Sequence, residues 1–179
     1  PGGDHDAARL VNDLETNIRD ILREDQAVLA RLLTHRDYYV QAAYKPVKNE
    51  GVQLVSTANN GKRSKYATAY NLPLDWKWSH NRQPLQFGAE ERAGVLTHPA
   101  WLVGWSGNFE NHPVQRGKWI RTHLLGGTGP DVPIGVDARV PEKAHTTFRD
   151  RLAMATQAAE CWPCHRKMDP LGVTFDRFD

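Results

Sequence analysis

The stretch Cys161-Trp162-Pro163-Cys164-His165 says more about this chain than any other part of its sequence. Its two cysteines are the only ones among 179 residues, two residues separate them, and a histidine follows directly. The spacing C-x-x-C-H is typical of c-type haem attachment, in which both thiols bond to vinyl groups of the haem. The imidazole of His165 is then the axial ligand on one side of the iron. We therefore predict one covalent haem c, bound through Cys161, Cys164 and His165.

Other chemistries also use two cysteines at this spacing. Zinc needs four ligands, and the sequence has no second cysteine pair. A disulfide across two residues closes a very small loop and adds little stability. A dithiol redox centre of the thioredoxin type is the strongest rival, since Cys-Trp-Pro-Cys resembles such a site. That site follows a β-strand, whereas residues 148–160 (FRDRLAMATQAAE) have a helical pattern, so haem is favoured.

The composition limits the class and the location of the protein. Apolar residues make up 40% and charged residues 25% of the chain, as in ordinary soluble globular proteins. A net charge of +2 argues against nucleic acid as the main partner, and no apolar run is long enough for a membrane span. The chain begins at Pro1, so we expect a processed or truncated product of something longer. Haem is joined to thiols after export, which predicts the periplasm or the extracellular face of a bacterium.

The apolar periodicity predicts a mainly α fold, a helical haem-binding domain with little or no β structure. Residues 7–22 form the clearest amphipathic helix, and Asp25 is expected to cap a second helix over 26–35. The apolar face continues through residues 38–44, until Pro46 ends it. The other predicted helices cover residues 92–105 (interrupted at Pro99), 113–125 (ended by Gly126-Gly127) and 147–160.

The segment from residue 45 to residue 86 differs in composition from its surroundings. It is rich in Asn, Gly, Ser and Lys, and its alternation supports at most one short strand. We expect a long irregular, polar insert, in which Asn60-Gly61 favours a hairpin. Three prolines make residues 128–141 an extended linker. The predicted division is a helical module over 1–135, with the insert at about 45–86, and a C-terminal haem-attachment module over 136–179.

The residues after His165 indicate the surroundings of the haem. The run DPLG at 169–172 has turn composition, and a backbone carbonyl of this turn is expected to accept the Nδ1 proton of His165. Met168 lies on the same side of the ring as His165, so we expect it to pack against the porphyrin edge rather than bind iron. Phe175 and Phe178 are expected to pack there as well and to exclude water.

The sequence leaves the sixth iron ligand open. His112 is the best candidate, because it precedes a helix start and has Arg116 and Trp119 close by. For any single histidine, a role without iron is the more common one. Arg116 and Lys118 either neutralise haem propionates or belong to a solvated helix face. The other candidates for the sixth ligand are His98, His123, His145 and Met154.

Four motifs resemble those of a known family, the bacterial multidomain haem c proteins with planctomycete-type cytochrome domains. RAGVLT at 92–97 and HPVQRGKW at 112–119 resemble its RGGLLT and SPVxRGKW stretches. CWPCHRKMDPLG at 161–172 and FDRFD at 175–179 resemble its C-terminal haem module.

The resemblance is good over residues 90–179 and weak over about 10–44, and the insert has no counterpart. His112 stands where the family usually has Ser or Thr, which leaves open whether an iron ligand was gained here. The resemblance implies export, one haem c, and association with other domains or subunits. It implies no particular reaction.

Taken together, the motifs predict a c-type cytochrome unit that carries electrons through one haem, as a subunit or fragment of a larger exported redox assembly. A redox partner protein or a larger membrane-associated complex is the expected partner. A haem oxidase or peroxidase-type enzyme with an open sixth iron site is one alternative, although no distal histidine–arginine pair is evident. A structural accessory subunit stapled by its haem is another. The sequence contains no evident nucleophile–base pair or carboxylate dyad.

Overall fold

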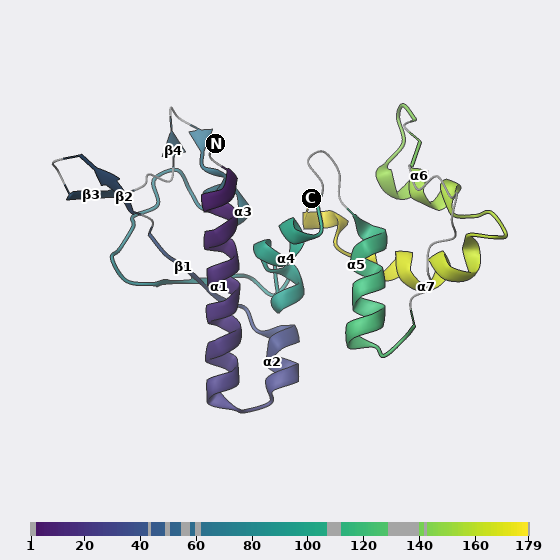
Figure 1. Ribbon diagram of the computed structural model, residues 1–179, viewed down its shortest axis with the longest axis horizontal. Helices are drawn as coiled ribbons and strands as arrows, with labels where there is room; N and C mark the ends of the chain where they lie inside the picture. The colour runs from purple at the N-terminus through teal and green to yellow at the C-terminus, as the bar shows by residue number, and fades with distance from the viewer. Residues whose placement is uncertain are drawn as a thin grey trace. The chain divides into compact units, whose positions relative to one another are not determined.

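The computed structural model divides the chain into two compact units, residues 1–104 and residues 105–179 (Figure 1). It describes residues 3–42, 44–48, 51–54, 58–59, 62–106, 112–128, 140–141 and 143–178. Helices predominate, so the predicted mainly α class is confirmed. The β structure in the described residues consists of three two-stranded antiparallel ladders, all in the first unit. Among these residues, no helix combines the length and the apolar character needed to cross a membrane.

The first unit begins with the long helix α1 (Gly3–Glu24) and the short helix α2 (Val28–Thr34). α1 forms where the apolar periodicity predicted it and extends further at both ends. The prediction that Asp25 caps α2 is wrong. Asp25 and Ala27 both have positive φ angles, 48° and 46°, and Ala27 precedes the helix without a side-chain cap. Leu29 of α2 is 66% exposed, so this helix buries less of its apolar face than its sequence suggests.

A strand replaces the helical continuation that was expected after residue 37. β1 (Asp37–Val40) has the sequence DYYV, and aromatic and β-branched side chains favour strands. It pairs antiparallel with β6 (Gln83–Gln86) over its whole length. The other ladders join β2 (Tyr44–Val47) to β3 (Gly51–Leu54), and β4 (Ala58–Asn59) to β5 (Lys62–Arg63). The last ladder flanks Asn60-Gly61, where a hairpin was predicted.

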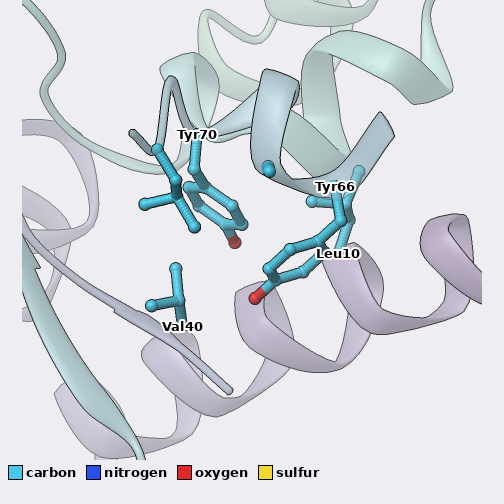
Figure 2. Close-up of a cluster of buried hydrophobic side chains, with 6 residues drawn as sticks. Leu10, Val40, Tyr66 and Tyr70 are labelled. Carbon is cyan, nitrogen blue, oxygen red and sulfur yellow. The ribbon is translucent and has the colours of Figure 1, made fainter. Parts of the chain in front are cut away.

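The core of the first unit draws heavily on the segment that was predicted to be an irregular insert. α3 (Lys65–Ala69) begins at Ser64, whose hydroxyl accepts a hydrogen bond from the Ala67 amide at 3.1 Å. Tyr66 on this helix is completely buried. The segment therefore belongs to the folded body of the unit. η1 (Val95–Thr97) and α4 (Pro99–Gly104) follow, and Pro99 begins α4. The buried cluster consists of Leu10, Val40, Tyr66, Ala67, Tyr70 and Leu72 (Figure 2).

A buried carboxylate on α1 joins this aromatic core. Asp13 is 2% exposed, and its Oδ2 accepts hydrogen bonds from the hydroxyls of Tyr66 at 2.5 Å and Tyr70 at 3.0 Å. Both hydroxyl groups are directed toward α1 (Figure 2). His98 accepts the Ala100 amide proton at Nδ1, so its Nε2 carries the proton that it donates to Tyr70 at 3.2 Å. Burial raises the pKa of Asp13 to about 6 and lowers the pKa of His98 to about 3.

The raised pKa of Asp13 makes the stability of the first unit depend on pH. Between pH values of about 4 and about 6, the folded carboxyl holds a proton that the unfolded one has lost, so its stabilising contribution falls as pH rises. Asp13→Asn has no such titration. We expect the free energy of unfolding of the natural chain, relative to Asp13→Asn, to fall by about 2 kcal/mol from pH 4 to pH 7. Urea unfolding followed by tryptophan fluorescence measures this difference, and a difference that does not change with pH contradicts it.

Helices are the regular elements of the second unit in its described residues. α5 (Pro113–Trp119) has Pro113 in its first turn, as predicted, and continues into a π-helical turn, η2 (Ile120–Leu124). α6 (Phe148–Ala155) is capped by Thr147, which forms a capping box with Asp150, and it ends before the cysteine motif. The remaining elements are α7 (Trp162–Val173) and η3 (Asp176–Phe178). Most of the predicted linker over 128–141 lies outside the described residues.

Two glycines let α5 and α7 touch backbone to backbone. A Cβ on Gly117 would overlap the Met168 carbonyl, and a Cβ on Gly172 would overlap the Pro113 carbonyl. Pro113 lies beside Gly172 and Gly117 beside Met168, so the two helices run antiparallel. Because α5 packs on α7, the structure divides after Gly104, whereas the sequence placed the boundary near residue 135.

We predict that Gly117→Ala destabilises the second unit, because the added methyl meets backbone that cannot move independently of α7. The expected loss is about 1–3 kcal/mol, even though alanine is favoured over glycine in helices by roughly 1 kcal/mol. Gly104→Ala is the matched control, because an added Cβ there meets no atom within 4 Å. Hydrogen exchange of the α5 and α7 amides measures the effect. Equal protection in the two variants contradicts the close helix contact.

Candidate haem-attachment site

The cysteine–histidine motif forms the first turn of α7. The carbonyl oxygen of Cys161 accepts hydrogen bonds from the amides of Cys164 and His165, both at 3.2 Å. Pro163 lies in this first turn, where an amide hydrogen has no helical partner in any case. The thiols of Cys161 and Cys164 are not linked to each other. Residues at positions i, i+3 and i+4 share one side of a helix, so the three predicted haem-binding residues lie on one face.

This face of α7 is the covered one. Its start is half-buried at Cys161, Cys164 and His165, and its end is buried at Met168 and Gly172. The reactive side chains are therefore partly accessible, while the far end of the same face is anchored against α5. The exposed residues on the other side of the helix are Trp162, Pro163, Arg166, Lys167 and Pro170.

A carboxylate one turn further along α7 orients His165. Nδ1 of His165 lies 3.0 Å and 3.1 Å from the two carboxylate oxygens of Asp169. Nδ1–H is then the donor, which leaves Nε2 as the nitrogen whose lone pair is available to a metal. The predicted turn at 169–172 is wrong, and so is the backbone acceptor expected from it. α7 instead continues through Pro170. Pro170 has no amide hydrogen, so the carbonyl of Arg166 lacks its usual helical partner. The helix tolerates this because both residues lie on its exposed face.

Asp169 also lies close to the end of α6. The hydroxyl of Thr156 is 2.9 Å from the Leu152 carbonyl and 3.3 Å from Oδ2 of Asp169, and it can donate its one proton to either. Burial raises the pKa of Asp169, and the hydrogen bond from His165 acts in the opposite direction. The contacts of Asp169 thus connect the cysteine–histidine motif to α6.

The structure places His112 beside the end of α7 that is distant from His165. His112 precedes Pro113, whose carbonyl lies against Gly172, and His165 comes seven residues before Gly172, about 10 Å along the helix axis. The side chain of His112 is exposed. Because the helices run antiparallel, it is η2 that contacts the earlier part of α7.

The other candidates for the sixth ligand occupy varied positions. His98 belongs to the first unit, where both of its ring nitrogens make hydrogen bonds in the core. His123 on η2 stacks on Trp119, with ring centroids 4.9 Å apart and an interplanar angle of 12°. His145, which has a φ of 59°, and Met154 on α6 are both exposed. The sixth ligand stays a prediction.

Arg116 on α5 does not belong to a solvated helix face. Its side chain is completely buried, and its Nη2 donates to the Ser106 hydroxyl at 2.9 Å. Lys118 is half-buried.

Met168 and Phe175 are 6% and 8% exposed, so both belong to the interior of the second unit. Met168 follows His165 by three residues on the same face of α7, as the sequence indicated.

Two features of the site were not predicted from the sequence. Asp169 follows His165 at i+4, a spacing that indicates contact once the helix is known to continue past Pro170. Gly117 and Gly172 were not recognised as the points of contact between helices. Within the described ranges, no group of three or more His, Cys, Asp and Glu side chains is arranged to hold a metal ion.

A known protein family matches the C-terminal part of the chain. Residues 92–179 match the family described as PSCyt3: Protein of unknown function (DUF1588). This is a family of domains associated with planctomycete-type cytochromes, in agreement with the resemblance of the motifs in the same region. The family name indicates a cytochrome-related role. No curated protein and no solved structure matched the chain.

Proposed function

We propose that this chain is a c-type cytochrome unit that carries electrons through one haem bound to Cys161, Cys164 and His165. The observation that carries the proposal is the first turn of α7, where two unlinked thiols and an imidazole share one half-buried face. These donors fit haem c, because the thiols provide two covalent bonds and Nε2 of His165 provides an iron ligand. The cytochrome-associated family of residues 92–179 supports it. When bound, haem supplies an iron that alternates between the ferric and ferrous states.

The residues of the second unit hold and orient this group. Cys161 and Cys164 attach it to α7, and Asp169 keeps the His165 ring in one tautomer and one orientation. Buried Met168 and Phe175 provide apolar surroundings on the same unit, which reduces access of water. The glycine contacts with α5 keep α7 in place. All of these features are available before the haem is attached.

We further propose that the chain works in the periplasm or at the extracellular face of a bacterium, as part of a larger exported redox assembly. Attachment of haem to thiols takes place after export, which supports this location. Its partner in this proposal is a redox protein or a membrane-associated complex that exchanges electrons with the iron.

A haem oxidase or peroxidase-type enzyme is the second candidate, and the contact between His165 and Asp169 favours it. A carboxylate acceptor increases the electron donation of an imidazole to its metal, which suits the activation of a bound molecule as well as electron transfer. The two candidates differ in whether the sixth iron position is open.

Absorption spectra test the proposal and separate the candidates. The chain, exported from cells that attach haem c, is compared in ferric and dithionite-reduced forms, with and without carbon monoxide. We expect c-type bands that carbon monoxide leaves unchanged, because an electron carrier keeps six ligands. Rapid carbon monoxide binding favours the enzyme. Absence of c-type bands contradicts the proposal and returns the dithiol site to consideration.

Covalent attachment depends on both thiols. We expect Cys161→Ala/Cys164→Ala to lose all haem when the protein is extracted with acidified organic solvent, since no thioether bond remains. Trp162→Ala is the matched control, because Trp162 lies between the cysteines but is 51% exposed. Haem that stays with the double variant, or that leaves the control equally, argues against thioether attachment.

The position of His112 gives a separate prediction. We expect His112→Ala to leave the ferric and ferrous spectra unchanged, because the side chain of His112 is exposed and lies beside the end of α7 that is distant from His165. A change from low-spin to high-spin iron in this variant identifies His112 as the sixth ligand and contradicts this expectation.

A further inference from the structure

We propose that Asp169 is a positioning residue that strengthens the bond from His165 to the iron and keeps the reduction potential low. The inference rests on the proposed function, because it concerns the haem that Cys161 and Cys164 attach. No match to a known protein and no motif in the sequence assigned this role to Asp169.

The geometry is that of a dedicated hydrogen bond. Both carboxylate oxygens of Asp169 lie within 3.1 Å of Nδ1 of His165, and the two side chains are 24% and 15% exposed. The residues are one helical turn apart, so the helix backbone itself sets the distance between them. Among the described residues, both hydrogen-bond contacts of Nδ1 of His165 are with Asp169.

A carboxylate acts differently from the backbone carbonyl that commonly serves as this acceptor. Its negative charge makes the hydrogen bond from Nδ1 shorter and stronger and draws the proton away from the ring. Electron density on the ring rises, so Nε2 becomes a better donor to iron. Ferric iron carries one more positive charge than ferrous iron and gains more from this donation. Half-burial of the pair lessens screening by water and increases the effect.

The position of Asp169 is held from both sides. Met168, the residue before it, has its carbonyl packed against Gly117, and Gly172 packs against the Pro113 carbonyl. The backbone that carries Asp169 is therefore held in place by the contact between α5 and α7. This arrangement pre-organises the imidazole before iron is bound.

Helix stability does not explain a carboxylate at this position. Asp169 lies in the second half of α7, where the helix dipole disfavours negative charge. Its hydrogen-bond contacts are with Nδ1 of His165, at 3.0 Å and 3.1 Å, and with the Thr156 hydroxyl at 3.3 Å, so the role that its geometry supports is the orientation of His165.

The test is the reduction potential of the haem-loaded chain carrying Asp169→Asn, measured by redox titration. Asparagine keeps the shape and an acceptor oxygen but removes the charge. We expect the equilibrium to shift about tenfold toward ferrous iron, which is an increase of about 59 mV. Glu160→Gln is the matched control, because it removes an exposed carboxylate next to Cys161 and should leave the potential near that of the natural chain.

Each outcome decides the inference. A potential that matches that of Glu160→Gln overturns it, while c-type bands in both proteins leave the proposed function intact. If Asp169→Asn fails to take up haem, Asp169→Glu decides, because it displaces the carboxylate by one methylene. A smaller shift in the same direction supports the inference, and an unchanged potential overturns it. Absence of haem from the natural chain overturns both the inference and the proposed function.

Discussion

The contact between α5 and α7 is the constraint on which the rest of the second unit depends. Gly117 and Gly172 remove the side chains that would separate the two backbones, so the helices meet at the Met168 and Pro113 carbonyls. This contact buries one face of α7 and leaves the start of that face half-open. The thiols and the imidazole therefore lie on a helix that is anchored at its far end, while the three side chains themselves stay partly accessible. Covalent attachment of a large cofactor requires both properties.

The local signals of the sequence predicted a large part of this structure. The apolar periodicity of α1, the proline that begins α5 and the C-x-x-C-H spacing each depend on neighbouring residues alone, and the predicted mainly α class is confirmed. Tertiary contacts decided the remainder. Tyr66 and Tyr70 sit in a polar stretch of sequence, yet they are buried because Asp13 on α1 accepts their hydrogen bonds. Pro170 indicated a turn, but the exposed side of α7 tolerates it.

The first unit contains a buried carboxylate and the second a half-buried one, and their hydrogen-bond partners differ. Asp13 accepts hydrogen bonds from two neutral hydroxyls, and burial raises its pKa. Asp169 accepts from an imidazole, and the pair lies on the half-buried face of the cysteine motif. The hydrogen bonds of Asp13 lie in the core of the first unit, whose tyrosines come from the segment that the sequence predicted to be an irregular insert. The hydrogen bond of Asp169 lies in the candidate haem-attachment site itself. Both escaped prediction because hydrogen bonds between side chains leave little trace in composition or periodicity.

The central claim is that Cys161 and Cys164 attach one haem. The most direct measurement is the intact mass of the denatured chain after export from cells that attach haem c. The account predicts the mass of the polypeptide plus one haem, with no reactive thiol left. A mass equal to the polypeptide alone, with two titratable thiols or one disulfide, contradicts it.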